Sequence, residues 1–563
     1  MSNFAVAITF KLLTIMMKEN TVKIFEQSFK DNWDRPCLTD YNTKETITYA
    51  DFARDIAKIH LFYKEIGIQE GDHVAIIGKN NPTWVTLFLA TITYGATGAT
   101  VLVAMAVYLV VYFLQERGAG NDAQMLLIDS WCWYAPLNIN LALGVDGVSV
   151  VMILLSAFIV FAGVFASWEI NPLPRQFFMW FFLLSIGVFG FFISVDLFTM
   201  FMFYEVALIP MYLLIGVWGS GDKNYSAMKL TLMLMGGSAF LMLSILGIYY
   251  HSSADGNLTM NLLKVAQNNA IPHDWQLYLF PMAFVGFGVL GAMFPFHTWS
   301  PDGHASAPTA VSMLHAGVLM KLGGYGCFRI AIYLMPYAAT ELGWIFLTLT
   351  GISIVYGAFS ACVQTDLKYI NAYSSVSHCG MVLFAILMYN QTAMTGAVLQ
   401  MLSHGLMTAL FFALIGQIYG RTHTRDIRDM GGMMHIMPYL GVGYVIAGLA
   451  SLGLPGLSGF AAEMTIFFGS FQEAGLLQRV FTVAACASIV ITAVYILRVV
   501  GKLLFGEVQN EHHRELTDAV WYERFSTTVL ICSVAAIGCF PNFFGDIIRD
   551  SFLPVVDAIK NVL

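Results

Sequence analysis

The sequence predicts an all-α polytopic membrane protein of about thirteen transmembrane helices, preceded by a small α/β soluble fragment. Hydrophobic residues make up 58% of the chain and charged residues 11%, far below the charged fraction of about 25% in soluble domains. Apolar runs recur that are long enough to cross a bilayer, which requires about 20 residues. The composition changes sharply near residue 98, so we expect one domain at 1–98 and a membrane domain at 99–563.

The first domain has the charge density of a soluble protein. The segment TITYADFARDIAKIHLFYKEIGI (46–68) has helical periodicity, and HVAIIGKN (73–80) is typical of a short buried strand. These two segments predict the helix and one strand of the α/β fragment.

The second domain consists of apolar segments separated by short polar loops. We predict spans at 99–114, 147–167, 176–194, 196–217, 229–250, 277–297, 309–334, 342–363, 369–388, 393–420, 436–470, 479–505 and 525–545, the sixth and eleventh containing breaks. Alternate loops differ in Lys and Arg content, ten residues against five. Because cytoplasmic loops are richer in these residues, we expect the N-terminal fragment in the cytoplasm and the C-terminus outside.

Two of the spans contain residues that interrupt helices. One carries Pro295, Pro301 and Pro308, and the other carries Gly453, Pro455 and Gly459. Broken helices at membrane depth line polar cavities or are covered by protein, and paired breaks are typical of transport sites built on inverted repeats. For Pro301 a loop between two short helices remains an alternative, whereas for Pro455 we expect a broken helix.

Ionisable residues lie inside several predicted spans. Glu205, Lys321 and Glu463 are each placed well within a different apolar segment, and His378 and His404 lie in two neighbouring segments. Charged groups at this depth are costly and mark ion or proton paths, and an imidazole can relay a proton. A lone histidine would more often be a packing residue, but two beside a lysine and a glutamate favour a proton relay. No HxxH or HExxH spacing indicates a metal site.

Five motif strings resemble one family over about residues 99–563. They are FYEVALIPMYLLIGVWG, FPFHTWSPDGHASAPTAVSMLHAGVLMKLGGYG, QTDLKYINAYSSVSHCGMV, LQMLSHGLMTALFFALIGQIYGRTHTRDIRDMGG and LPGLSGFAAEMTIFFGSF. The chain is similar to the antiporter-like M subunits, or mitochondrial chain 4, of proton-pumping NADH:quinone oxidoreductase (complex I).

The resemblance implies a role for each buried group. Glu205 would be the charged partner in the uptake half, Lys321 the central lysine, His378 and His404 the relay, and Glu463 the exit-side carboxylate. The implied setting is the bacterial inner membrane, beside other membrane subunits of complex I. NADH, flavin, iron–sulfur clusters and quinone would belong to partner subunits, because this chain has no GxGxxG and no cysteine cluster.

The chain departs from the family at two places. The family usually has a lysine seven residues before the histidine of FHTW, paired with the uptake glutamate, and here that position is Leu290. We expect Lys229 or His315 to serve Glu205 instead, and Lys229 therefore joins the candidate site. The family's fourteen spans are also reduced to thirteen, with the soluble fragment in place of the first.

Residues of about 18–98 resemble the N-terminus of adenylate-forming acyl-CoA synthetases, most specifically at GDHVAIIGKNNPTWV. The Ser/Thr/Gly-rich phosphate loop of that family does not follow, and GATGAT (95–100) lacks the lysine of such a loop. We therefore expect an incomplete, inactive fragment, as a gene fusion or an assembly artefact would produce.

Other functions are less well supported by the sequence. Basic residues are scattered and the net charge is −8, which argues against nucleic acid. The eight cysteines form no CxxC pair and are typical of small core residues. A subunit of a multi-subunit cation/proton antiporter remains the main alternative, and a membrane-anchored acyl-activating enzyme is a third.

Overall fold

The chain folds into two compact units, each described here by itself. The computed structural model describes residues 29–39, 46–65, 99–253, 256–473 and 475–562. The units comprise Met1–Met105 and Ala106–Leu563, so the division falls within α5 (Ala99–Gly118).

The first unit contains an antiparallel pair, β1 (Pro36–Thr39) and β2 (Thr46–Thr48), followed by α3 (Tyr49–Glu65). Thr48 and Asp51 exchange hydrogen bonds at the start of α3, which is why the helix begins there. Phe52 and Ile56 form a small core under the strands. The helix predicted within 46–68 is thus confirmed over 49–65, while residues 46–48 form β2 and residues 66–68, like the strand predicted at 73–80, lie outside the described residues.

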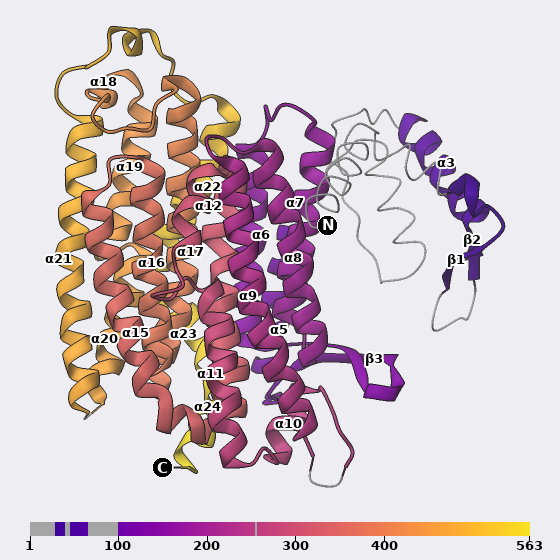
Figure 1. Cartoon of the computed structure of the whole chain (residues 1–563). Helices are drawn as coiled ribbons and strands as arrows, with labels where there is room; N and C mark the ends of the chain where they lie inside the picture. Colours follow the sequence, from indigo (N-terminus) through magenta and orange to yellow (C-terminus); the bar gives the residue numbers. More distant parts are fainter. Residues whose placement is uncertain (1–28, 40–45, 66–98, 254–255, 474, 563) are drawn as a thin grey trace, which may run out of the picture. The chain divides into compact units, whose positions relative to one another are not determined.

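The second unit is a bundle of long apolar helices (Figure 1). Among the described residues, seven helices are long and apolar enough to cross a membrane. They are α6 (Gly147–Ala166), α7 (Pro174–Ile193), α8 (Leu197–Trp218), α9 (Lys223–Tyr250), α15 (Pro336–Val363), α17 (Gln391–Thr422) and α21 (Leu476–Leu504). Each agrees with a predicted span, while the total of thirteen and the inverted repeats stay predictions.

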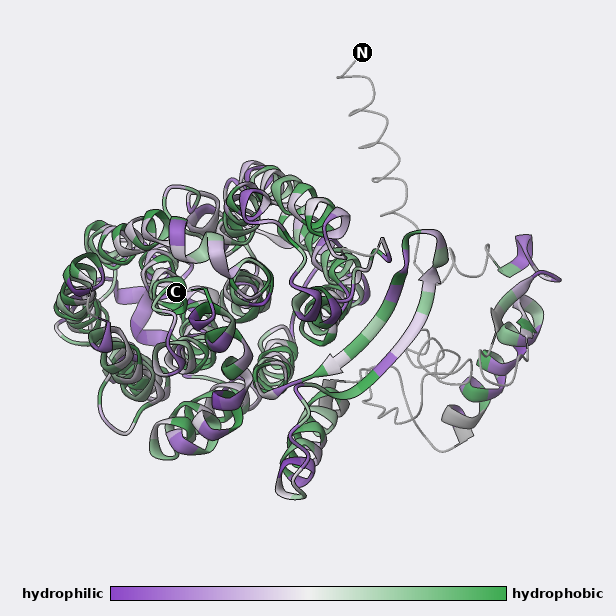
Figure 2. Ribbon diagram, turned by 90° about the horizontal axis from the view of Figure 1, so that it is seen from below, coloured by the Kyte–Doolittle hydropathy of each residue, from purple (hydrophilic) through white to green (hydrophobic). Residues whose placement is uncertain are grey.

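Helix α17 lies at the centre of this bundle. Its most apolar window is entirely buried, whereas that of α21 is one third buried. Viewed from one end, purple hydrophilic segments are enclosed by greener helices, so polar groups gather inside the bundle (Figure 2). An interior of this kind is where a membrane protein holds its ionisable groups.

A β-hairpin precedes the bundle and was not predicted from the sequence. Strands β3 (Leu126–Tyr134) and β4 (Ile139–Val145) pair antiparallel around a short turn, η1 (Ala135–Leu137). Asn138 follows this turn with a positive φ of 50°, a conformation that asparagine tolerates.

The sixth predicted span is broken earlier than Pro301. Helix α11 (His273–Leu290) ends at its last apolar residue, residues 291–298 form turns, and α12 (Trp299–Ser306) follows. Pro301 therefore lies within α12, in the first turn, where a missing N–H costs nothing. The break expected in the predicted span 277–297 is therefore present, but it occupies residues 291–298 and does not lie at Pro301.

The next span contains two π-helical segments. Its parts are α13 (Thr309–Leu314), the π segment η2 (His315–Leu319), α14 (Met320–Gly326) and the π segment η3 (Cys327–Ile332). Every residue from Ala310 to Met335 is buried. Such π turns are rare and are frequent at functional sites.

The eleventh span is interrupted where its glycines and proline predict. Helix α19 (Pro438–Ser451) stops, and α20 (Ser458–Gln472) begins after a loop. Gly453 and Gly456 in this loop have positive φ values of 65° and 92°, which a glycine adopts without strain. The predicted break is confirmed.

The last predicted span, 525–545, is also not one straight helix. Helix α22 (Trp521–Cys539) ends before Pro541, and the following segment, beginning with α23 (Pro541–Arg549), is bent away by 74°. The remaining elements are α10 (Leu262–Asn268), α16 (Leu367–Ile386), α18 (Met433–Ile436), η4 (Glu511–Glu515), η5 (Asp550–Phe552) and α24 (Leu553–Lys560).

Candidate proton-transfer site

Lys321 lies in α14, directly after the π segment η2, and is 2% exposed. Its Nζ donates a hydrogen bond to the carbonyl of Ala316 within η2. A second contact, at 2.8 Å, joins the same Nζ to Nδ1 of His404 on α17. The ammonium group is thus held between a backbone dipole and an imidazole nitrogen.

The contact between Lys321 and His404 depends on a close approach of two backbones. A Cβ added to Gly405 would lie 2.6 Å from the carbonyl oxygen of Gly317. Since real side chains do not fit at that distance, these two glycines allow α17 and η2 to touch beside the site. Lys321 follows Gly317 by four residues, and His404 directly precedes Gly405.

The row of buried groups continues from His404 to His378 and Glu463. The two imidazole centroids are 5.1 Å apart, and Nδ1 of His378 lies 3.8 Å from Oε1 of Glu463. Both histidines and Glu463 are at most 5% exposed. Four ionisable side chains from α14, α17, α16 and α20 therefore form one continuous row, the Lys321–Glu463 row.

Gln400 was missed in the sequence and contacts this row. Its Nε2 donates to Nδ1 of His378 at 3.0 Å, while its Oε1 is buried without a hydrogen-bond partner among the described residues. An amide can present either its N–H or its oxygen after a half-turn. Gln400 can therefore bond to His378 with or without a proton on Nδ1.

Two further histidines lie on the other side of Lys321. His304 in α12 and His315 in η2 stack with ring centroids 4.0 Å apart, and Trp299 covers His315. Both rings are fully buried, and none of their four nitrogens has a hydrogen-bond partner among the described residues. His304 was missed, although it lies within the FPFHTWSPDGHASAP motif string.

Lys229 does not pair with Glu205, so the expectation that it replaces the family's lysine as the partner of this carboxylate was wrong. Its Nζ lies 2.7 Å from Oδ2 of Asp302 in α12, whose other oxygen accepts a hydrogen bond of 3.0 Å from Tyr369. His315, the second expected partner, is stacked between Trp299 and His304 instead. Asp302 was not predicted as a site residue, because it directly follows Pro301, where a loop between two short helices was one of the expected structures.

Glu205 occupies a different environment from the row. Glu205 lies on α8, its carboxylate is near the hydroxyl of Ser238 on α9, and its Oε1 is buried without a hydrogen-bond partner among the described residues. Ser238 is nine residues beyond Lys229, which corresponds to about 13 Å along a helix. This separation along α9 is why Lys229 does not reach Glu205.

Cations gather at the end of α12. Lys368 donates to the carbonyl of Ala307 at 2.7 Å, and Arg425 donates to that of Ala305 at 2.6 Å. Arg425 also lies 3.1 Å from Asp366, the N-cap of α16. Positive charge at a helix C-terminus is stabilising, so these contacts fix α12, which carries Asp302 and His304.

A second buried ion pair joins Asp146 to Arg329 in η3. Asp146 caps α6 by accepting a hydrogen bond from the backbone N–H of Ser149, and the rings of Tyr325 and Phe328 lie against the guanidinium. The pair fastens the π-containing helix to α6. Among the described residues no group of three His, Cys, Asp or Glu side chains could hold a metal ion.

The chain is similar to known proteins in sequence and in structure. The family model described as NADH:quinone oxidoreductase/Mrp antiporter, TM, matches residues 194–492, and one described as AMP-binding enzyme matches residues 25–120. NADH-quinone oxidoreductase subunit M of Rickettsia prowazekii (strain Madrid E) is 33% identical over 77% of this chain and 86% of its own length. NAD(P)H-quinone oxidoreductase chain 4 3 of Picosynechococcus sp. is 37% identical over 67% and 69%, respectively.

Two solved structures share the fold. A chain of respiratory complex I from Thermus thermophilus has a TM-score of 0.75 at 24% identity, over 85% of this chain and 98% of that one. A chain of the Mrp complex from Dietzia sp. has a TM-score of 0.69 at 17% identity, over 82% and 94%. These likenesses describe the helical membrane unit.

Proposed function

Because the chain belongs to the NADH:quinone oxidoreductase/Mrp antiporter family of membrane subunits, we propose that it moves protons as the M-type subunit of a proton-pumping NADH:quinone oxidoreductase. The observation that carries this proposal is the Lys321–Glu463 row, a chain of buried ionisable groups in a multi-pass membrane protein. The neighbouring membrane subunits of the complex would be its partners. NADH, flavin, iron–sulfur clusters and quinone would be held by other subunits.

The distances along the row suit stepwise proton transfer. Lys321 can pass a proton to Nδ1 of His404 across 2.8 Å, and an imidazole can release a proton from its other nitrogen. The step to His378 would pass through a bridging water, because the Nε2 atoms of His404 and His378 have no hydrogen-bond partner among the described residues. The last step, from Nδ1 of His378 to Oε1 of Glu463, spans 3.8 Å and would likewise need a water or a small movement of a side chain.

Electrostatic coupling would link the row to the rest of the complex. Charges only a few ångströms apart interact strongly where water is excluded, so protonating one group changes the proton affinity of the next. Lys321 is the residue most suited to switch, because it contacts both a backbone carbonyl and His404. A displacement driven by a neighbouring subunit would alter both contacts.

A second candidate function is a subunit of a multi-subunit cation/proton antiporter. The description of the matched family covers both kinds of protein, and the fold is shared with a chain of an Mrp complex. The curated relatives named above, at 33% and 37% identity, favour the oxidoreductase. Proton transport that depends on sodium but not on NADH oxidation would favour the antiporter instead.

The decisive experiment replaces Lys321 by alanine in the intact complex in membrane vesicles. Proton transport per NADH oxidised by this complex should fall, since the row loses the group that donates to His404. Lys321→Arg should fail as well, because a guanidinium does not release its proton. Lys264→Ala, in the short helix α10, is a matched control. Normal transport by an assembled Lys321→Ala complex would disprove the proposal.

A further inference from the structure

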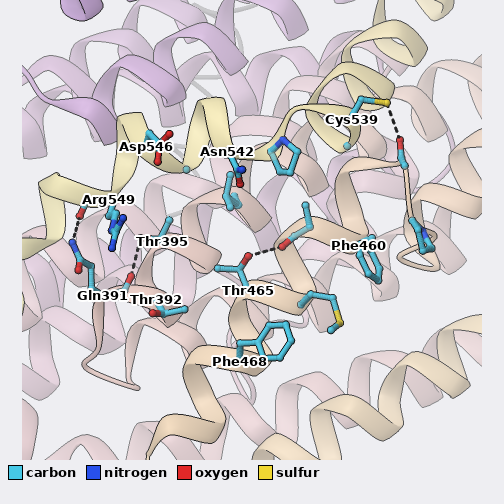
Figure 3. Close-up of a pocket in the computed structure, with 18 residues that line it drawn as sticks. Gln391, Thr392, Thr395, Phe460, Thr465, Phe468, Cys539, Asn542, Asp546 and Arg549 are labelled. Atoms are coloured by element: carbon cyan, nitrogen blue, oxygen red, sulfur yellow. Dashed lines mark hydrogen bonds between the residues drawn. The ribbon is translucent and has the colours of Figure 1, made fainter. Parts of the chain in front are cut away.

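A cavity of about 610 Å³ lies where the start of α17, the helix α20 and the bend between α22 and α23 come together (Figure 3). Most of the residues that line it are apolar or small. Two of them, Phe460 and Phe468 on α20, are 37% and 64% exposed, so the cavity is a groove on the side of the helical unit. In a membrane protein, an apolar groove of this kind faces lipid or a neighbouring subunit.

Polar side chains gather at one end of this groove. Gln391, Asp546 and Arg549 lie there, whereas the apolar start of α20 lies at the opposite end (Figure 3). Helix α17 begins and α20 ends at the level of the polar group, where Asn390, the N-cap of α17, donates to the carbonyl of Gly469 at 2.9 Å. The polar end is therefore at a membrane surface, and the apolar walls extend from it into the bilayer.

The apolar walls have nearly the depth of one lipid leaflet. From Phe468 to Phe460 they follow eight residues of α20, which corresponds to about 12 Å along a helix, and one half of a hydrocarbon core is about 15 Å thick. The break before α20 lines the inner end through Pro455 and Gly456, and Sγ of Cys539 lies 3.8 Å from the carbonyl oxygen of Gly456. An acyl chain from the adjacent leaflet would thus fit lengthwise and end at the break.

The polar end carries one positive and one negative charge. Asp546 and Arg549 are three residues apart on α23 and so project from the same side of that helix, and both are exposed. Neither belongs to an ion pair within the part of the chain that the structure describes. Gln391 donates to the backbone carbonyl of Arg549 at 3.0 Å, which holds α23 against α17 and leaves both charged groups for a ligand.

We propose that this groove binds one phospholipid whose headgroup carries both a phosphate and a primary ammonium, as phosphatidylethanolamine does. Arg549 would bind the phosphate through parallel N–H groups, and the carboxylate of Asp546 would accept hydrogen bonds from the ammonium. One acyl chain would lie along Phe460 and Phe468. A purely anionic lipid fits less well, because it brings no cation to Asp546. This site lies apart from the Lys321–Glu463 row and does not depend on the proposed function.

Photo-crosslinking of the intact complex tests this assignment. The complex is reconstituted in vesicles of phosphatidylglycerol that contain a trace of phosphatidylethanolamine with a diazirine on one acyl chain. A parallel sample contains the same amount of diazirine-labelled phosphatidylglycerol. After illumination, the labelled peptides of α20 are quantified by mass spectrometry against the total labelling of the complex. The ethanolamine probe should label α20 at least fivefold more than the glycerol probe, because only its headgroup satisfies both charges.

Two variants separate the contributions of the charges. Asp546→Asn should lower labelling by the ethanolamine probe to the level of the glycerol probe, since the amide no longer attracts the ammonium. Arg549→Gln should lower labelling by both probes severalfold, because the phosphate loses its cation. Asp550→Asn is a matched control: this carboxylate is exposed on the next residue but does not line the groove, so labelling should be unchanged.

Three results would overturn the lipid site. Equal labelling of α20 by the two probes in the unaltered complex would show that the groove does not select an ammonium headgroup. Labelling of α20 by neither probe would show that a neighbouring protein subunit fills the groove. Equal labelling in Asp546→Asn and Asp550→Asn would show that Asp546 does not hold the headgroup. None of these measurements uses proton transport, so a failure of the proposed function would leave them unaffected.

Discussion

Lys321 and Glu205 are both ionisable residues buried in apolar helices, yet their surroundings differ. Lys321 contacts His404 at 2.8 Å and begins a row that reaches Glu463. Glu205 is near the hydroxyl of Ser238, and one of its oxygens has no partner among the described residues. A buried ionisable group can pass on a proton when a second titratable group lies close to it. Among the described residues, Lys321 has such a contact with His404, whereas the hydrogen-bond partner of Glu205 is the hydroxyl of Ser238.

The comparison also separates two kinds of ion pair. Lys229 and Asp302 form a direct pair at the side of α12, with each side chain 24% exposed. The residues of the row are nearly inaccessible and are joined mainly through imidazoles. The Lys229–Asp302 pair is therefore nearer to water than the row is, and the Asp302→Asn variant described below tests whether this pair takes part in proton uptake.

The largest effect should come from Glu463, the last group of the row. Glu463→Gln keeps the shape of the side chain but cannot accept a proton from His378, so proton transport should fall roughly tenfold or more. The measurement is proton uptake by vesicles per NADH oxidised. If Glu463→Gln transports normally and Glu463→Ala does not, the residue acts through packing.

A smaller but clear loss is expected for Asp302→Asn. The amide would leave Lys229 without its counter-charge and would remove the acceptor of Tyr369, which should slow transport severalfold. Lys223→Ala is a suitable control, because that lysine lies in the same helix as Lys229 and donates to the carbonyl of Val217. Equal transport in Asp302→Asn and the control would contradict an uptake role.

Glu205→Gln should have a milder effect than either of these changes. No cation contacts Glu205 among the described residues, so the amide breaks no ion pair, and transport should change by less than about twofold. Leu290→Lys sharpens the test, because Gly237 packs on Val289 and brings Leu290 near the level of Ser238. The new lysine should make transport sensitive to Glu205→Gln in the double variant. Insensitivity of the double variant would show that Leu290 is not close to Glu205.

The smallest effect should be at Asp426, outside the membrane spans. Its hydrogen bond and ion pair with Arg428, at 2.6 Å, lower the pKa of Asp426 to about 2. This stabilisation, at most about 1 kcal/mol for an exposed pair, is complete above the ordinary carboxyl pKa of about 3.9 and is lost as the pH falls through 2. At pH 7, Asp426→Asn should therefore speed hydrogen exchange in the loop 422–430 slightly and leave transport unchanged. Unaltered exchange would mean that the pair contributes nothing.

The sequence indicated the four members of the row, because each is conspicuous inside an apolar segment, but it also placed Glu205 in the same row, and the structure does not. Lys321, His378, His404 and Glu463 were all proposed from their position alone, and the structure brings them together. The break at Gly453 and Pro455 was equally visible, since glycine and proline interrupt helices in any setting. The resemblance to the M subunits is confirmed by the relatives, and the individual roles remain proposals.

Features that depend on tertiary geometry could not be predicted. The partner of Lys229 depends on which residue of α9 lies level with Glu205 and on the placement of α12, neither of which the sequence pattern indicates. The stacking of His304 on His315 follows from the turns at 291–298 and at Ala307. The β-hairpin at 126–145 was missed because β3 is almost wholly exposed, so its sequence lacks the alternation of apolar and polar residues that identifies a half-buried strand.

The π segments beside Lys321 have a mechanical consequence. A π turn holds one residue more than an α turn, so η2 and η3 each store one extra residue within a helix that is buried throughout. If η2 rewound to α geometry, everything beyond it would rotate by about 100° and shift by about 1.5 Å. That motion would carry the Nζ of Lys321 away from His404, whereas the Asp146–Arg329 pair would resist it from the far end.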